Sequence, residues 1–238
     1  MTIRFLPSGD TALVVEFGSV VDRALSDRVL RLAAGLEGTK GIVETVPTFR
    51  SIMIHYDPLS TGFAELKSAV EALLGRDKPI ERQAKLWHVP ACYEGEWAPD
   101  LEDVARRTGL GTAEVVKLHS EVRYHIYMLG FLPGYPYMGD LPEVLRLPRR
   151  IDPRVKVPAG SVAIATTMTA IYTLESPGGW HLIGTTPLRF FDPAAERPAI
   201  LSPGDAIEFE PVSPGEFASV KRAVLAGDYK VQSERLVL

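Results

Sequence analysis

The residues best suited to contact a ligand lie between positions 123 and 186, where aromatic, hydroxyl and basic side chains recur among glycines and prolines, with few acids. Three clusters stand out, at residues 130–137 (GFLPGYPY), 157–161 (VPAGS) and 176–181 (SPGGWH). Proline fixes φ, and glycine admits positive φ or the close approach of a ligand, so the clusters demand specially shaped loops. Shaped aromatic loops tend to bind ligands, although these residues could instead close the turns of a small barrel.

The predicted binding surface combines rings, hydroxyls and exposed backbone N–H groups. Its residues are Phe131, Pro133, Tyr137, Ser161, Tyr172, Gly178, Gly179, Trp180 and Thr186. The paired glycines offer N–H groups that suit a carboxylate or phosphate oxygen. Each residue could equally belong to a tight turn, and Trp180 could pack in the core or at a partner interface instead of walling a pocket.

Arg154 is the predicted cation of this surface. It brackets Val155 together with Lys156, so both cations point to one face of an extended segment. The pair could simply be solvated, which is expected of Lys156, whereas Arg154 is predicted to be a catalytic residue whose guanidinium holds an anionic group.

A protein nucleophile and a metal are not expected. Cys92 is the single cysteine, which excludes an internal disulfide, and with no obvious base beside it we expect an inert buried thiol. His55, His88 and His125 lack metal-ligand spacing, which predicts no protein-bound metal. The chain has neither a Gly-x-Ser-x-Gly elbow nor a phosphate-binding P-loop, and Asp205 is expected to form a turn.

The composition narrows the class of partner. The chain has 238 residues, 46% of them hydrophobic, and its 26 basic and 30 acidic residues leave a net charge of −4. Without a basic patch, neither nucleic acid nor an anionic membrane surface is an expected partner. No apolar stretch approaches the length of a membrane span and the start lacks the apolar region of a signal peptide, so a cytoplasmic location is predicted.

The first 83 residues read as an α+β domain. Apolar segments in residues 3–17 flank a Pro-Ser-Gly-Asp turn and predict a hairpin. Helical spacing from Leu25 to Leu36 behind Asp22 predicts a capped helix that stops at Gly38. Strands at 42–49 and 51–56 and a helix at 63–74 complete a β-β-α-β-β-α order. We predict two helices on a small, mostly antiparallel sheet.

Residues 84–238 read as a second, mainly β domain, with a boundary in the charged stretch 76–85. A strand at 86–90 precedes two helices, one opened by Pro99 and Asp100 and the other capped by Thr112. Short strands are predicted at 124–129, 161–166, 170–174, 180–183, 188–191 and 206–210, which indicates a barrel or sandwich. The tail 216–238 predicts a final helix or strand, without deciding between them.

A series of short motifs, taken in order, resembles the KipI family over nearly the whole chain. They are residues 92–93 (CY), 99–101 (PDL), 115–120 (VVKLHS), 130–131 (GF), 133–134 (PG), 153–154 (PR), 157–161 (VPAGS), 171–172 (IY), 176–180 (SPGGW) and 202–205 (SPGD). Members of that family are named as the B subunit of 5-oxoprolinase, as allophanate hydrolase subunit 1 or as an inhibitor of a sporulation histidine kinase.

The resemblance implies an N-terminal α+β domain followed by a cyclophilin-like β-barrel at residues 84–238. It implies a complex with a homologous C subunit and an A subunit, in which ATP with Mg²⁺ drives the opening of the lactam of 5-oxoproline at a composite site. It also implies that His119 orients substrate or transfers a proton, although the helical spacing of His119 alone favours a structural histidine. A subunit of this kind is expected to be inactive alone.

Two positions depart from the family pattern. Met168 stands where a Gln is usual, and Thr185 stands where an Arg is usual. Threonine cannot offer the fixed charge and bidentate fork of arginine, so a different lactam, amide or urea-like substrate stays open. Two further functions also stay open: a regulatory protein that occludes a histidine kinase, and a urea-carboxylase-related carboxyltransferase whose partner is a biotinylated carrier.

Overall fold

The computed structural model describes residues 3–75 and 83–236. It divides into two compact units, Met1–Gln83 and Ala84–Val237, each with its own hydrophobic core. Most of the predicted boundary stretch, residues 76–82, lies outside the described residues.

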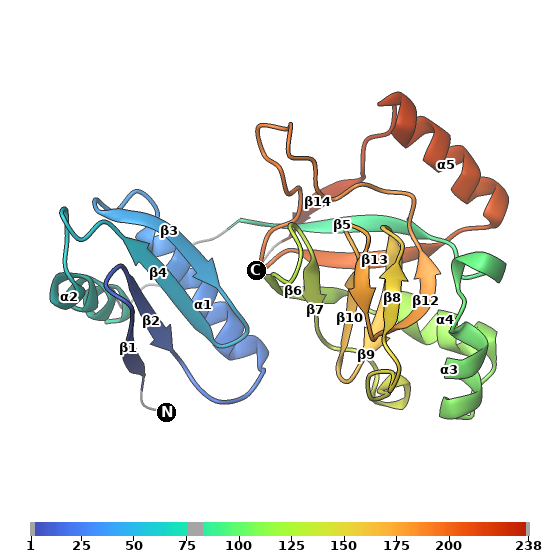
Figure 1. The fold of residues 1–238 in the computed structure, drawn as a ribbon, viewed down its shortest axis with the longest axis horizontal. Helices are drawn as coiled ribbons and strands as arrows, with labels where there is room; N and C mark the ends of the chain where they lie inside the picture. Colours follow the sequence, from blue (N-terminus) through green and yellow to red (C-terminus); the bar gives the residue numbers. More distant parts are fainter. Residues whose placement is uncertain (1–2, 76–82, 237–238) are drawn as a thin grey trace. The chain divides into compact units, whose positions relative to one another are not determined.

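The first unit contains a four-stranded antiparallel sheet with two helices packed on it (Figure 1). Its elements are β1 (Arg4–Ser8), β2 (Ala12–Glu16), α1 (Arg23–Leu36), β3 (Ile42–Pro47), β4 (Ser51–Tyr56) and α2 (Phe63–Leu74). The strands lie in the order β1-β2-β4-β3. Asp22 caps α1 by accepting a hydrogen bond from the Leu25 N–H at 3.0 Å, as the sequence predicted. Every predicted element of this unit is present with nearly the predicted bounds.

The second unit is built around a large mixed sheet. Its strands are β5 (Ala84–Ala91), β6 (Tyr124–Leu129), β7 (Pro136–Met138), β8 (Arg154–Val157), β9 (Ser161–Ala165), β10 (Met168–Ile171), β11 (Ser176–Gly178), β12 (His181–Thr185), β13 (Ala206–Pro211) and β14 (Ser233–Leu236). Eight of them form one sheet in the order β12-β9-β10-β7-β6-β13-β5-β14, while β8 and β11 pair separately. The neighbours β13 and β5 are parallel.

The large sheet closes on itself. An isolated antiparallel bridge joins Cys92, directly after β5, to Thr185 at the end of β12, with N···O distances of 2.8 and 2.9 Å. A ring of hydrogen-bonded strands therefore runs from β12 through β5 and back, as in a barrel. Its kinship to the cyclophilin barrel stays a prediction.

The two faces of the sheet bury different clusters. On β9, Val162 and Ile164 belong to the main core, whereas Ala163 and Ala165 belong to a smaller cluster with Tyr135, because successive side chains of a strand point to opposite faces.

The helices of this unit are α3 (Leu101–Thr108), α4 (Thr112–Ser120) and α5 (Pro214–Ala226), with 3₁₀ turns η1 (Gly95–Trp97) and η2 (Glu143–Leu145). The tail thus forms both a helix, α5, and a strand, β14 (Figure 1). In the described part of the chain no helix is long and apolar enough to cross a bilayer.

Three predictions for this unit were wrong in detail. The N-cap of α4 is Gly111, and Thr112 is already helical. No strand forms at 188–191, where a single bridge pairs Phe191 with Ala199. The short strands β7 and β11 were not predicted, because proline and glycine lie in or beside each of them and obscure the alternating pattern, whereas the segment treated as extended around Val155 forms β8.

Asp205 does form a turn, as predicted, and also anchors β5. Its carboxylate accepts hydrogen bonds from the Ser202 N–H at 3.0 Å, the Lys85 N–H at 2.9 Å and the Trp87 indole N–H at 2.9 Å.

Candidate functional site

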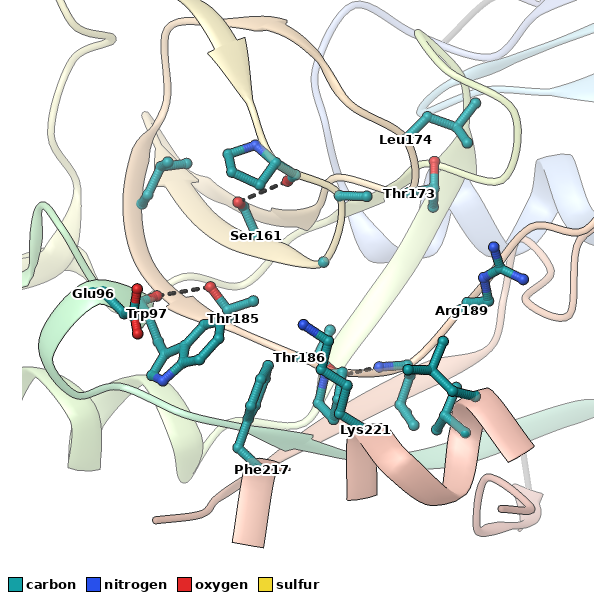
Figure 2. Close-up of a pocket in the computed structure, with 18 of the residues that line it drawn as sticks. Glu96, Trp97, Ser161, Thr173, Leu174, Thr185, Thr186, Arg189, Phe217 and Lys221 are labelled. Carbon is teal, nitrogen blue, oxygen red and sulfur yellow. Dashed lines mark hydrogen bonds between the residues drawn. The ribbon is translucent and has the colours of Figure 1, made fainter. Parts of the chain in front are cut away.

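A pocket of about 490 Å³ opens on the second unit where five segments meet (Figure 2). These are η1, the turn before β9, Thr173 and Leu174 after β10, the end of β12 with the chain that follows it, and α5. The lining residues that matter to its chemistry are Glu96, Trp97, Ser161, Thr185, Thr186, Arg189, Phe217 and Lys221.

The turn before β9 fixes one wall of the pocket. Gly160 has φ +87°, a conformation that side-chain-bearing residues rarely adopt, and a Cβ there would collide with the Thr186 carbonyl oxygen. The Gly160 N–H donates to the Tyr172 carbonyl at 2.7 Å, and the Thr186 N–H donates to the Gly160 carbonyl at 2.9 Å. Glycine at this position therefore lets the 157–161 motif contact the end of β12 backbone to backbone.

Three hydroxyl groups line this wall, and each makes a different hydrogen bond. Ser161 is buried, and its hydroxyl donates to the Pro158 carbonyl at 2.8 Å. The Thr185 hydroxyl donates to the Trp97 carbonyl at 2.8 Å. The Thr186 oxygen accepts a 3.3 Å hydrogen bond from the Leu188 N–H, which leaves its proton for a ligand.

The opposite wall comes from α5 and η1. The rings of Phe217 and Trp97 lie 4.2 Å apart between centroids at an angle of 35°. Lys221 places its ammonium 5.6 Å from the Trp97 centroid and 6.0 Å from that of Phe217, close enough for a cation–π interaction. In Figure 2 the Lys221 side chain lies beside Phe217 and Thr186, and Arg189 supplies a second cation.

This lining suits charge stabilisation better than covalent catalysis. Among the described residues that line the pocket there is no histidine and no cysteine, and Glu96 is the single acid. Ser161 has no base hydrogen-bonded to it, so it lacks the partner that would activate a serine nucleophile.

Of the predicted binding residues, the structure places Ser161 and Thr186 in this pocket. Thr185, where the chain departs from the family pattern, also lines it.

His119 lies in the core, away from the pocket. Its side chain is fully buried, and its Nδ1 and Nε2 atoms lie 2.9 Å from the Tyr93 hydroxyl and the Thr169 hydroxyl. Thr169 donates its proton to the Ala163 carbonyl, so Nε2 must donate to Thr169 and Nδ1 must accept from Tyr93. Burial lowers the pKa of His119 to about 3. This geometry supports the structural role and not the catalytic one.

Arg154 binds an anion, but an internal one. Its guanidinium donates to both carboxylate oxygens of Asp100, at 2.8 and 2.6 Å, and Arg150 adds a third contact at 3.2 Å. The Asp100 carboxylate is buried and also accepts from the Leu182 N–H at 2.7 Å. The predicted cation therefore ties β8 to the start of α3 and β12.

The remaining predicted residues gather around an aromatic cluster on the outer face of β7, β9 and β10. Tyr135 is its centre, with ring centroids of Phe131, Tyr137, Tyr172 and Trp180 within 5.0 to 6.4 Å of it.

The glycines and proline of this region act as packing residues. Gly178 leaves room for the Tyr172 hydroxyl, and the Gly179 carbonyl accepts from the Arg150 N–H at 2.8 Å. The Pro133 carbonyl accepts from the Thr173 hydroxyl at 2.7 Å, which pins the 130–134 loop to the cluster.

The sequence interpretation missed the residues on the far wall: Trp97, Arg189, Phe217 and Lys221. The sequence does contain a signal for Phe217 and Lys221, because together with Val224 they are spaced to lie on one face of a helix. The tail sequence does not decide between helix and strand, so this signal could not be used.

Cys92 is buried, as predicted, and burial raises the pKa of its thiol, which favours an unreactive cysteine. No cluster of three or more histidine, cysteine, aspartate or glutamate side chains able to hold a metal occurs among residues 3–75 and 83–236.

Comparison with known proteins adds a family match. Residues 3–201 match the carboxyltransferase domain, subdomain C and D. The chain is similar to the B subunit of 5-oxoprolinase from Escherichia coli O157:H7, with 41% identity over 208 residues that cover 87% of this chain and 95% of the relative.

Two longer proteins are also similar. The solved structure of TTHA0988 superposes with a TM-score of 0.76 at 36% identity, covering 89% of this chain and 40% of that chain. Urea amidolyase of Lachancea kluyveri is 28% identical over 269 residues, which cover 99% of this chain and 15% of that enzyme. This chain therefore spans less than half of either protein.

Proposed function

The chain belongs to the carboxyltransferase-domain family, subdomain C and D, that includes the B subunit of 5-oxoprolinase, and we propose that it works as the B subunit of an ATP-dependent enzyme that opens a lactam or amide. Its substrate in this proposal is 5-oxoproline or a closely related lactam, and its partners are a homologous C subunit and an A subunit in the cytoplasm.

The observation that carries the proposal is the similarity to the B subunit of 5-oxoprolinase, which extends over 87% of this chain and 95% of that relative. The 157–161 motif and the end of β12, which are far apart from η1 and α5 in sequence, form adjoining walls of the same cavity. Of the family motifs, 157–161 lines this cavity, and we propose that the cavity is the part of the site that this subunit contributes.

The lining explains why such a subunit would need partners. A lactam amide is stabilised by resonance, so opening it requires activation of its carbonyl oxygen, which phosphoryl transfer from ATP can provide. The described lining offers hydroxyls and cations that can orient a substrate and stabilise negative charge, but no activated nucleophile, and Glu96 is its single carboxylate. We propose that the C subunit supplies the missing groups at a composite site.

We propose that ATP and its Mg²⁺ bind in the complex outside this pocket. Glu96 is the single carboxylate in the described lining, while Mg²⁺ in nucleotide sites is held by carboxylates and phosphates together. Arg189 and Lys221 could contact one anionic group but do not form a cradle for a triphosphate.

The test is reconstitution. This chain is co-expressed and purified with C-subunit and A-subunit homologues, and ADP release is measured with and without 5-oxoproline. We expect release that depends on 5-oxoproline and disappears when this chain is left out, with no release by this chain alone.

Different results point to different functions. A stable complex that releases ADP with another lactam, amide or urea would replace the substrate, and the similarity to a urea amidolyase makes urea the first to try. Failure to form any complex would overturn the proposal and favour a regulatory binding protein.

A further inference from the structure

The helix α5 contributes one wall of the pocket although it lies beyond the family match. The match ends at residue 201, and α5 spans Pro214–Ala226. The helix is well defined locally: the Ser213 side chain and the Glu216 carboxylate cap each other's backbone N–H groups, and Gly227 ends the helix at φ +79°.

The face of α5 that lines the pocket is apolar except for Lys221. Phe217, Val224 and Leu225 line the pocket from this helix together with Lys221, which follows Phe217 by one turn. Phe217 is buried and anchors the helix against Trp97. Lys221 is thus held at the cavity by the same stripe that attaches the helix.

The Lys221 ammonium has no internal counter-charge. It lies over the rings of Trp97 and Phe217, and no carboxylate in the described residues forms an ion pair with it. By contrast, Lys156 and Lys117 on the same unit pair with Glu175 at 2.9 Å and Glu121 at 3.9 Å. A lysine at a cavity mouth, without a carboxylate partner, favours a ligand that brings a negative group.

We propose that Lys221 is the specificity-determining residue of the pocket. Its ammonium binds the carboxylate or phosphate group of a ligand, and the rings of Trp97 and Phe217 cover the apolar part of the same ligand. The Thr186 hydroxyl on the facing wall donates a hydrogen bond to the same ligand. Arg189 and Glu96 are the other charged groups of the lining, one adding to this attraction and the other opposing it. The choice of a lactam acid as ligand rests on the proposed function.

The experiment measures binding, not turnover. Isothermal titration calorimetry on the isolated full chain compares 5-oxoproline with 2-pyrrolidinone, which has the same lactam ring without the carboxylate, and with inorganic phosphate. Lys221→Met keeps the aliphatic stem over the rings and removes the charge, whereas Lys221→Arg keeps the charge. Arg222→Met is the matched control, because it removes a cation from the next position of the helix, outside the pocket.

We expect Lys221→Met to weaken binding of 5-oxoproline about tenfold or more, as for the loss of a charged hydrogen bond, and to leave 2-pyrrolidinone unchanged. Lys221→Arg and Arg222→Met should stay within about threefold of the wild type. If phosphate binds more tightly than 5-oxoproline and also loses affinity in Lys221→Met, the natural ligand group is a phosphoryl group, and Lys221 is still the residue that binds the anion.

Three results would overturn the proposal: no anion bound by the wild type, equal losses in Lys221→Met and Arg222→Met, or equal losses for both lactams in Lys221→Met. Because the assay needs no partner subunit, a failure of ADP release in the reconstituted complex leaves this result intact, so the two failures can be told apart.

Discussion

His119 has a side chain that could act in catalysis, but both of its ring nitrogens make hydrogen bonds inside the core. The neutral imidazole accepts from Tyr93 and donates to Thr169, and both of its nitrogens are therefore satisfied in the core. In the unfolded chain the ring takes up a proton below about pH 6.5, whereas in the folded chain its pKa is about 3. The stabilisation from keeping this ring neutral is complete above pH 6.5 and is lost progressively as the pH falls toward 3.

Replacing His119 by glutamine, which does not titrate, should remove this pH dependence. Below pH 6.5 we expect the free energy of unfolding of the wild type to fall faster than that of His119→Gln, by about 1.4 kcal/mol for each pH unit. Urea unfolding at several pH values between 4 and 7 measures the difference. Parallel profiles for the two proteins would contradict the assignment. Comparing the wild type with His119→Gln at each pH also controls for the remaining histidines, which both proteins share.

At this scale the sequence predicted residue types better than residue roles. Ser161 and Thr186 do line the pocket, and Cys92 is buried as expected. Arg154 was predicted to hold an anionic group at the site, whereas its guanidinium pairs with Asp100, a partner that could not be identified because 54 positions separate the two residues and no local spacing links them. A buried carboxylate satisfied by two arginines is visible only once the chain is folded.

The elements were more predictable than the contacts between them. Periodicity, caps and turn residues located α1, α2, α3 and β6 within a residue or two, since these depend on local sequence. Strands of three or four residues such as β7 and β11 carry too few positions to show alternation, and their pairing is fixed by the neighbouring strand. The wall made by α5 also depends on tertiary packing, in which Phe217 meets Trp97 across 120 positions of sequence.

The turn before β9 should be intolerant of a side chain at its glycine. Gly160→Ala is expected to cost about 2 kcal/mol or more of unfolding free energy, because alanine at positive φ is strained and its Cβ meets the Thr186 carbonyl. Chemical denaturation measures this loss. Gly215→Ala is the matched control: this glycine lies in α5 with open space around its Cβ, so alanine should be neutral or slightly stabilising. Equal effects of the two substitutions would contradict the role of the turn.

For the whole molecule, the main feature is that each unit encloses its own core. The first core contains Leu13, Val29 and Ile54, and the second contains Val89, Ile164 and Phe209, with no residue common to both clusters. Each unit therefore has the apolar interior that independent folding requires.

Fragments covering residues 1–83 and 84–238 should each fold alone. We expect cooperative thermal unfolding and dispersed amide signals in nuclear magnetic resonance spectra of both. In the first fragment, Leu13→Ala removes a fully buried side chain and should cost about 2–5 kcal/mol. A fragment that unfolds without a cooperative transition would show that its core is insufficient for independent folding. For the first fragment, the absence of destabilisation by Leu13→Ala would show the same.

The bridge that closes the large sheet has a consequence for how this family diversifies. It is made by the main-chain atoms of Cys92 and Thr185, so any residue except proline, which lacks the N–H, can form it at position 185. That side chain nevertheless lines the pocket. A change of side chain at this position can therefore alter the lining of the pocket while leaving the closing hydrogen bonds in place, so the lining can vary without rebuilding the barrel.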